Sequence, residues 1–504
     1  MTGALARLAL ARPRRRLERL RRDPAGAQAE VLGWLLAAHA TTPLGRALGL
    51  EGVRGPADFA ARVPLRGFEA HRPHLPRPRY WAQTTGTTAG QKDVPVTRAL
   101  LRANAAAVQL LLASRCLELG ALRPVLGKVF FLGACTPLTR GPDGVLRGAA
   151  TTIGLRERPW FFRRRVLPGP EVDALPSWAE RMDAVVDQAA GAAGGPAPDV
   201  RVAFGMPPWL LAFAERLAAR RGVLPRALWP GLELVVTGGT FAAPYRRRLE
   251  AAFGAPGEGG PAYRAMYSAT EGFFGVQDGP DPAYLPLWDS IYLELVPPDE
   301  LDAERPTRLR PWEAELDRDY ALVISSWAGL FAYPVGDTVR VVSRDPLRLV
   351  PTGRVRRWAN VAGEKVTIAQ VEEAAVRAGA SLGLALGEVA LLAEPPADAD
   401  VLGAARPRHR WLVEVAPTRD AAALAPALAQ ALDRALAALS PTYRTRREGL
   451  TPALGAPEVT LLPPGRFQAW LEAEGRTGAH HKVPRILESL PPALSPAPAL
   501  ALSA

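Results

Sequence analysis

The segment TTGTTAGQK, residues 84–92, brings together groups that bind anions. It holds four threonines and two glycines, and it ends on Lys92, one of only four lysines in a chain whose lysines and arginines total 62. Threonine hydroxyls, backbone amides in a tight turn and one ammonium group can together hold a polyphosphate. The glycine spacing and the Gly-Lys-Ser/Thr ending of a Walker loop are missing, which excludes a P-loop NTPase. Taken alone, the segment is also explained by a plain surface loop.

Three later turns also place polar groups beside predicted strands. In YSATEG, Glu271 is a single carboxylate among small residues, where it either caps a helix or binds a ligand. In YPVGDTVRV, Asp337 leads into a strand, where it either forms an ordinary turn or accepts hydrogen bonds from paired hydroxyls such as those of a ribose. In AGEKVT, Lys365 follows a glycine-rich turn and precedes a helix, in a segment that also fits a domain linker.

The lysines stand out because the chain otherwise uses arginine. They are Lys92, Lys128, Lys365 and Lys482. The chain has arginine at almost every position where either cation would serve. In such a chain, a lysine is expected to remain where a compact ammonium is required and a planar guanidinium does not fit. We therefore hypothesise that Lys92, Lys365 and Lys482 carry chemistry; full activity of all three lysine-to-arginine variants would contradict this.

Composition limits the class of protein. The chain has 504 residues and 48% apolar content, which predicts two or three globular domains. No apolar run approaches the roughly 18–20 residues that span a bilayer, and arginines interrupt the apolar start before any cleavage-site pattern, so we expect a cytoplasmic protein with no membrane span. Cys116 and Cys135 fit no metal or disulfide pattern and are expected to be small core residues.

The net charge of +12 raises the question of nucleic-acid binding. The arginines are mostly scattered, without aromatic interleaving or a zinc-knuckle, KH-type or RRM-type signature, so we expect no nucleic-acid partner. A basic amphipathic helix near the N-terminus, RRRLERLRRD, either binds an anionic membrane or, as we expect, packs onto its own domain.

The elements expected around these residues indicate an α/β fold. Two helices are predicted within 1–50, a strand, turn and strand around 84–92, and a long helix over 98–119. Short apolar runs then alternate with helices as far as YSATEG, which predicts an α/β sheet. From 284 to 355 strands follow one another without helices, which suggests a β-barrel-like subdomain. The remainder predicts α+β structure, with helices near 367–378, over 420–439 and from Arg466.

We therefore expect a large N-terminal domain, built on α/β sheets, and a smaller mobile C-terminal α+β domain. The predicted segments are an N-terminal domain at 1–356, which includes the barrel-like subdomain at 284–355, a hinge at 357–364, a C-terminal domain at 365–490 and a flexible tail at 491–504.

Each motif is weak alone, but their order is specific. The order of the motifs resembles that of the adenylate-forming superfamily of acyl-CoA synthetases and luciferases. Along the chain they are the Thr/Gly/Lys loop, TGGT, the aromatic-x-x-Thr-Glu turn, Gly-Asp, Gly-Arg and Gly-Glu-Lys. Longer segments resemble the Gretchen Hagen family of auxin-responsive acyl acid amido synthetases, plant enzymes that join auxin, jasmonate or benzoates to amino acids. These segments are YSATEGFFG, LFAYPVGDTVRV with LVPTGRV, AGEKVT, SPTYRTRREG and GAHHKVPRI. The resemblance runs from residue 63 to 486.

The resemblance implies a role for each motif. The ATP phosphates would be bound by Thr84, Thr85, Gly86, Thr87, Thr88 and Lys92. The adenine site would be formed by Gly238, Gly239, Tyr267, Ser268, Ala269 and Thr270, with the last four also facing the acyl carboxylate. The remaining binding residues would be Glu271 for Mg²⁺, Asp337 for the ribose hydroxyls and Arg354 as a nearby cation.

The resemblance also implies catalytic lysines. They are Lys92, Lys365 and Lys482, and Lys365 would reach back from the C-terminal domain toward the phosphates. For Lys482 a structural role stays equally open, and His480 and His481 are either the base for the incoming amine or exposed bystanders.

The implied reaction depends on ATP and Mg²⁺. The enzyme adenylates a carboxylic acid, releases pyrophosphate and transfers the acyl group to an amine, expected to be an amino acid, forming an amide. Attack of a carboxylate on the α-phosphorus brings two anions together, so charge neutralisation and positioning must dominate catalysis. A hinge before Lys365 would let the small domain deliver this lysine and then admit the amine. Transfer to coenzyme A, giving a thioester, and a non-catalytic scaffold are the alternatives.

Two features concern substrate choice. Ala332 and Pro334 stand where the family commonly has arginines beside the tyrosine, so two cations near the nucleotide are missing. The segments expected to line the acyl pocket predict an aromatic or fatty acid because they carry Phe131, Phe204, Met206, Trp209, Trp327 and Phe331. The acid, the amine and the oligomeric state are not identified by the sequence.

Overall fold

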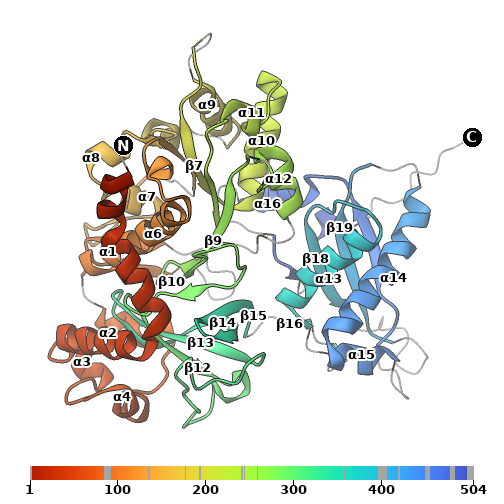
Figure 1. The fold of residues 1–504 in the computed structure, drawn as a ribbon. Coiled ribbons are helices and arrows are strands. Elements are labelled where there is room, and N and C mark those ends of the chain that lie inside the picture. Colours follow the sequence, from red (N-terminus) through yellow and green to blue (C-terminus); the bar gives the residue numbers. More distant parts are fainter. Residues whose placement is uncertain are drawn as a thin grey trace, which may run out of the picture. The chain divides into compact units, whose positions relative to one another are not determined.

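A computed structural model gives the fold (Figure 1). It describes residues 3–75, 77–83, 92–133, 137–175, 178–191, 195–239, 242, 245–257, 259–355, 358–359, 361–362, 364, 366–394, 406–417, 420–448, 454–476, 483–487 and 489–495. The chain divides into two compact units, Met1–Pro351 and Thr352–Ala504. The predicted first domain extends to 356, slightly past this division, and the predicted boundaries and hinge stay predictions.

In the described part of the first unit, the central sheet has the strand order β11-β10-β9-β8-β7-β3-β6. Strands β6, β3, β7, β8 and β9 run parallel to one another, whereas β10 is antiparallel to β9 and β11 is antiparallel to β10. Their bounds are β3 (Lys128–Leu132), β6 (Val166–Leu167), β7 (Val200–Gly205), β8 (Leu234–Gly238), β9 (Ala262–Ala269), β10 (Gly272–Val276) and β11 (Leu285–Pro286).

Helices cover both faces of this sheet because its strands are apolar on both sides. On β8, Leu234 and Val236 belong to the core cluster that also contains several buried residues of α6 (Arg98–Leu119), such as Leu110. Val235 between them belongs to the opposite cluster, with α9 (Trp178–Ala190), α10 (Pro207–Arg221) and α12 (Arg246–Phe253). This arrangement confirms the predicted α/β sheet.

The caps of α6 explain why its predicted bounds are correct. The Thr97 hydroxyl accepts a hydrogen bond from the Leu100 amide at the helix start, and Gly120 ends the helix at φ 59°, in the left-handed region. The other helical segments of the first unit are α7 (Ala150–Arg156), α8 (Trp160–Arg163), α11 (Pro225–Leu228) and the 3-10 helices Arg72–His74, Arg123–Val125, Pro170–Ala174 and Pro298–Glu300.

Two smaller sheets carry further candidate residues. The first has the order β2-β1-β5-β4, built from β1 (Tyr80–Gln83), β2 (Asp93–Val96), β4 (Thr139–Arg140) and β5 (Leu146–Gly148). Antiparallel pairing of Gln83 with Asp93 places the two ends of the predicted phosphate loop side by side. The second is an open sheet, because its hydrogen-bonded strands do not close on themselves. Its strands are, in order, β12 (Tyr292–Val296), β13 (Asp319–Ser326), β14 (Leu330–Arg344) and β15 (Leu347–Arg354). It occupies the predicted barrel-like region.

The N-terminal helices pack onto the first unit, and Figure 1 shows α1 (Gly3–Arg22) beside α6. Leu17 and Leu20 of α1 are buried in the large core cluster. Two of its arginines bind carboxylates of the same unit, because Arg16 pairs with Asp289 and Arg21 with Asp278. The expectation that this basic helix packs onto its own domain is confirmed. The helices that follow are α2 (Pro24–His39), α3 (Pro43–Leu48), α4 (Pro56–Arg62) and α5 (Phe68–His71).

The second unit is built on a sheet with the order β20-β19-β18-β21. Alternate residues of β18 face opposite cores: Leu391 lies in the cluster with α13 and α14, and Leu392 lies in the cluster with α16. The bounds are α13 (Ile368–Ser381), α14 (Ala421–Leu439), α15 (Pro441–Glu448), α16 (Arg466–Ala473), β16 (Trp358–Ala359), β17 (Val366–Thr367), β18 (Val389–Glu394), β19 (Arg408–Glu414), β20 (Glu458–Leu462), β21 (Ile486–Leu487) and a 3-10 helix Pro492–Leu494.

Two of the described helices, α6 and α14, are long and apolar enough to cross a bilayer by length and composition alone. Polar or charged residues interrupt the apolar residues of both, so neither was predicted from the sequence as a membrane span. One face of each contributes buried leucines to a hydrophobic core, which is also typical of the core helices of globular domains. Cys116 is buried in α6, where burial raises the pKa of its thiol to about 11. Cys135 lies outside the described residues.

Candidate functional site

The carboxyl ends of β8 and β9 lie at one edge of the central sheet. Gly238, the last residue of β8, pairs with Met266, which directly precedes Tyr267. Gly239 has φ 77°, which favours glycine, whereas a side chain at Gly238 would make only an ordinary contact of 3.4 Å with the Met266 carbonyl. Ligands of parallel sheets bind at this edge, so the two glycines lie where a nucleotide is expected.

Tyr267 links this edge to β14. Its hydroxyl donates a hydrogen bond of 2.9 Å to Oδ2 of Asp337. The Tyr267 ring packs against Phe274 and Tyr284, with centroids 5.0 and 5.9 Å away, and only 9% of the residue is exposed. Tyr267 therefore presents its hydroxyl rather than an open ring face. Ser268, Ala269 and Thr270, which follow it, are partly exposed.

Glu271 lies in a two-residue turn, because Ala269 of β9 pairs directly with Gly272 of β10. The residue is 8% exposed. Its Oε1 lies 3.4 Å from the Tyr333 hydroxyl, which donates to it. The turn thus holds a carboxylate at the end of a strand of the central sheet and next to β14.

Lys92 completes this cluster from a third element. It directly precedes β2, and its Nζ lies 3.4 Å from the Tyr333 hydroxyl. The same ammonium lies over two aromatic rings, 5.9 Å from the Tyr333 centroid and 5.7 Å from that of Phe68. Both rings offer their negative faces to the cation. Tyr333 therefore bridges the predicted phosphate lysine and the predicted magnesium ligand.

Tyr333 and His71 lie in this cluster, but neither was predicted as a site residue from the sequence. His71 is fully buried, and its Nε2 lies 2.9 Å from the Phe331 carbonyl oxygen and 3.1 Å from the Phe331 amide nitrogen, two residues before Tyr333. Its ring packs edge-on against that of Tyr333, at 6.1 Å. Burial lowers the pKa of His71, so a neutral ring is favoured. In the sequence, His71 stands in GFEAHR among both apolar and charged residues, a pattern that gave no signal for a site residue.

The structure explains one of the departures from the family pattern. Ala332 is fully buried and has φ 47°, which is rare for residues other than glycine. Its amide donates to the Ser325 hydroxyl, and its carbonyl accepts from the Arg66 amide. Pro334, by contrast, is partly exposed and lies where the pairing of β13 and β14 is irregular, as expected for a proline within a sheet.

Other predicted site residues lie outside the described part of the chain. They are Thr84, Thr85, Gly86, Thr87, Thr88, Lys365, Lys482, His480 and His481. Arg354 ends β15, and its side chain is likewise not described.

Glu364, the neighbour of Lys365 in the sequence, is described and fully buried. Its carboxylate accepts hydrogen bonds from the Val361 and Ala362 amides, at 2.9 and 2.7 Å, and lies 2.9 Å from Nε2 of buried His409. Burial alone would raise the pKa of Glu364, but the hydrogen bonds from His409 and the amides outweigh burial, so the pKa lies below its ordinary value. The turn before Lys365 is therefore anchored to β19.

The residues proposed to line an acyl pocket do not all lie together. Phe131 and Phe204 contact each other at 5.3 Å on neighbouring strands at the carboxyl edge of the sheet. Trp209 packs beside a different core cluster from Phe204, and Phe331 is fully buried. Trp327 lines a separate cavity beside α1 and α6. Met206 directly precedes α10, at its N-cap position, and is partly exposed.

One carboxylate at Glu271 fits a magnesium ion in a nucleotide site, where Mg²⁺ takes one or two protein carboxylates and completes its shell with phosphates and water. Among the described residues, no group of three or more histidine, cysteine, aspartate or glutamate side chains has the arrangement of a metal site. Bound there, Mg²⁺ would neutralise phosphate charge.

Family comparisons cover most of the chain. Residues 13–182 match the GH3 family N-terminal domain, residues 284–350 the GH3 family central domain and residues 372–491 the GH3 family C-terminal domain. A probable indole-3-acetic acid-amido synthetase GH3.2 from Oryza sativa subsp. japonica is 29% identical over 308 residues. That match covers 55% of this chain and 48% of the relative, so the chain spans about half the length of the relative.

Solved structures show the same fold. The GH3.15 acyl acid amido synthetase matches with a TM-score of 0.71 at 17% identity, over 94% of this chain and 93% of that chain. A 2-hydroxyisobutyryl-CoA ligase in the postadenylation state matches with a TM-score of 0.58 at 15% identity, over 94% of this chain and 92% of that chain. The predicted class, a large N-terminal α/β domain with a smaller C-terminal domain, is confirmed.

Proposed function

Since the chain belongs to the GH3 family, which confirms the resemblance seen in its motifs, we propose that it is an acyl acid amido synthetase. The enzyme uses ATP and Mg²⁺ to convert a carboxylic acid to an acyl adenylate and then transfers the acyl group to an amine, with an amino acid as the expected acceptor. Because ATP is a substrate, we place the protein in the cytoplasm. The observation that carries the proposal is the cluster of Lys92, Tyr333 and Glu271, in which residues from three of the sequence motifs meet at one hydroxyl.

In the first step a carboxylate oxygen bonds to the α-phosphorus of ATP, and the bond to pyrophosphate breaks. Lys92 supplies positive charge where the phosphates lie, and its position over two aromatic rings keeps that charge in place. Asp337 accepts hydrogen bonds from the ribose and is itself oriented by the Tyr267 hydroxyl. Glu271 would hold Mg²⁺, which neutralises phosphate charge. In the second step the amine nitrogen bonds to the acyl carbonyl carbon, AMP leaves and the amine loses a proton.

The test is pyrophosphate release from ATP with a panel of aryl, indolyl and fatty acids. One arm contains the twenty amino acids and another contains coenzyme A, and mass spectrometry identifies an amide or a thioester. Lys365→Ala should lower acid-dependent release by about 100-fold or more. Lys128→Ala is the matched control, because Lys128 binds the Arg164 carbonyl at 2.8 Å and belongs to none of the motifs.

The outcomes separate the candidate functions. An amide product that requires Lys365 supports the synthetase. A thioester in the coenzyme A arm would replace it with an acyl-CoA synthetase. Folded protein that binds ATP but releases no pyrophosphate with any acid would favour a scaffold, and folded protein that does not bind ATP would refute the adenylation proposal.

A further inference from the structure

Two neighbouring aromatic side chains are exposed next to arginines on α8. Trp160 is 62% exposed and Phe161 is 59% exposed, which is unusual for aromatic side chains of a folded domain. Figure 1 shows α8 at the outer edge of the first unit, and Arg163 and Arg164, which follow the two rings, are exposed as well. Apolar side chains that are exposed side by side, rather than singly, indicate an interaction surface.

The end of this segment is anchored to the loop before β3. The Arg165 guanidinium donates hydrogen bonds to the carbonyls of Val125 and Gly127, at 2.5 and 2.7 Å. Leu126, which lies between these two carbonyls, is itself 57% exposed. Of the seven large apolar side chains that are exposed in the described part of the chain, three therefore lie on these two joined segments. We refer to Leu126, Trp160, Phe161, Arg163 and Arg164 as the α8 patch.

Apolar and cationic groups adjoin one another in the α8 patch. The rings of Trp160 and Phe161 lie edge to face, with centroids 6.2 Å apart. The Arg164 guanidinium lies over the Trp160 ring, 4.9 Å from its centroid. The patch is therefore one group of side chains rather than separate exposed residues.

The arginines of the α8 patch are not neutralised by the protein. Glu157 is the only carboxylate between positions 143 and 171, and it pairs with Arg79 at 3.0 Å and accepts a 2.7 Å hydrogen bond from the Tyr80 hydroxyl. Within the described ranges, no carboxylate forms an ion pair with Arg163 or Arg164. The patch thus complements a surface that is anionic outside and apolar beneath.

We propose that the α8 patch binds the surface of a membrane that contains anionic phospholipids. The two aromatic rings enter the interfacial layer, where tryptophan is favoured, and the arginines pair with lipid phosphates. A protein partner is less well matched, because a stable protein interface buries roughly 800 Å² on each side, whereas the patch consists of one four-residue helix and one neighbouring loop residue. The patch shares no residue with the proposed catalytic cluster, so the proposal stands or falls separately from the synthetase activity.

The test is co-sedimentation of the full chain with phosphatidylcholine vesicles that contain about 30% phosphatidylglycerol. Binding to vesicles of phosphatidylcholine alone should be weaker by about tenfold or more. Brominated acyl chains quench indoles that enter the membrane. This quenching should be smaller for Trp160→Phe than for the native protein, although the variant still sediments with the vesicles.

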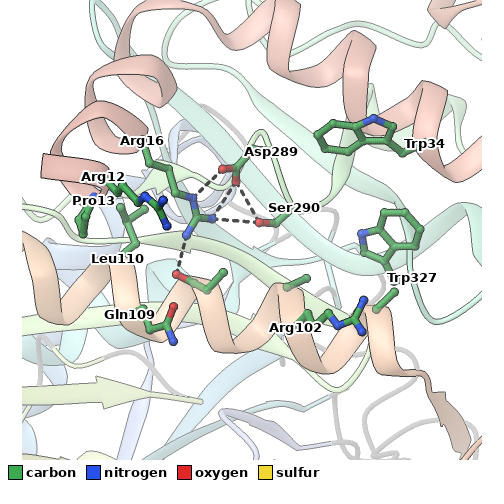
Figure 2. A pocket seen from close by; sticks show the side chains of 13 residues that line it. Arg12, Pro13, Arg16, Trp34, Arg102, Gln109, Leu110, Asp289, Ser290 and Trp327 are labelled. Atoms are coloured by element: carbon green, nitrogen blue, oxygen red, sulfur yellow. Dashed lines mark hydrogen bonds and ion pairs between the residues drawn. The ribbon is translucent and has the colours of Figure 1, made fainter. Parts of the chain in front are cut away.

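The double variant Trp160→Ser/Phe161→Ser should weaken binding to the anionic vesicles by about tenfold or more. Its matched control is Leu8→Ser/Trp34→Ser, which removes two exposed apolar side chains from the N-terminal helices and should bind like the native protein. Trp34 lines the cavity that alanines of α6 leave open beside α1 (Figure 2), and no residue of the α8 patch lines that cavity.

The double variant Arg163→Gln/Arg164→Gln should also weaken binding by about tenfold or more, since each arginine near an anionic surface contributes about fivefold. Arg14→Gln/Arg15→Gln is its matched control, because it removes the same charge from exposed positions of the basic helix α1.

Four results would overturn the proposal. They are no binding to anionic vesicles, equal binding to vesicles of phosphatidylcholine alone, equal losses in the patch variants and their controls, and quenching that is unchanged in Trp160→Phe. A dimer in sedimentation velocity that Trp160→Ser/Phe161→Ser dissociates, without vesicle binding by the native protein, would instead assign the α8 patch to contact between two copies of the chain.

Discussion

The Lys92 ammonium lies 3.4 Å from the Tyr333 hydroxyl, although 241 positions separate the two residues in the sequence. Tyr333 in turn donates to Glu271, also at 3.4 Å. Both contacts are longer than the ordinary ~2.9 Å of a strong hydrogen bond, so each of the two is a weak hydrogen bond. A hydroxyl between the lysine proposed to bind phosphate and the carboxylate proposed to bind a metal can position both.

Tyr333→Phe should keep the fold and slow adenylation. The variant removes one hydroxyl and leaves the ring under Lys92, so we expect roughly a tenfold loss in the rate of acid-dependent pyrophosphate exchange. Tyr320→Phe is the control, because its hydroxyl accepts a hydrogen bond from the Glu315 amide, away from the cluster. Equal rates in the two variants would show that the Tyr333 hydroxyl has no role.

Asp337→Asn should raise the KM for ATP by about tenfold, because the charged group proposed to accept hydrogen bonds from the ribose becomes a neutral amide. Tyr267→Phe leaves the carboxylate and removes only its 2.9 Å donor, so a smaller increase is expected. Steady-state kinetics of the single and double variants measure the coupling of the pair. Additive effects on KM would contradict the idea that Tyr267 acts through Asp337.

His71 should make stability depend on pH. Burial holds its folded pKa below the ordinary 6.5, so as the pH falls below 6.5 the unfolded chain binds a proton that the folded chain does not, and stability falls by at most ~1.4 kcal/mol per pH unit. Urea unfolding measures the free energy of unfolding between pH 7 and 5, and this free energy should fall less steeply with pH for His71→Gln than for the native protein. His74→Gln, at an exposed position, should follow the native protein. Parallel curves for all three proteins would rule out this contribution.

Glu364→Gln should destabilise the second unit by roughly 2–4 kcal/mol, because a fully buried carboxylate loses its charge beside His409 and the two amides. Glu373→Gln is the comparison, since it breaks an exposed i,i+4 pair with Arg377 and should cost less than about 0.5 kcal/mol. Because the folded pKa of Glu364 is lowered, its contribution is present above the ordinary value of 4.5 and is lost as the pH falls through the folded pKa. Chemical denaturation at pH 7 measures the difference, and similar losses in both variants would contradict it.

Ala332→Arg should fail to restore the family pattern. The side chain at 332 is fully buried, so an arginine there would be buried without a designed partner and should destabilise the protein by more than about 3 kcal/mol. Ala332→Gly should be within about 1 kcal/mol of the native protein, since relief at φ 47° offsets the lost methyl contacts. Pro334→Arg, at a partly exposed position, should fold. Thermal unfolding of the three variants compares these outcomes, and a stable Ala332→Arg protein would be inconsistent with the fold described.

Local patterns in the sequence determined the elements and the family. The helix over 98–119 was predictable because Thr97 caps it, Gly120 ends it and apolar residues recur at its spacing. The order of short motifs identified the family, since each motif is a local signal whose position along the chain is read directly.

Only the tertiary structure decided which of these residues meet. Tyr333 joins Lys92 to Glu271, and Tyr267 reaches Asp337, through pairing and packing of strands that lie far apart in the sequence. The same holds for the cavity, where arginines of α1 face alanines of α6. A sequence period fixes which side of a strand or helix is apolar, but it does not say which other element covers that side, because that choice depends on long-range packing.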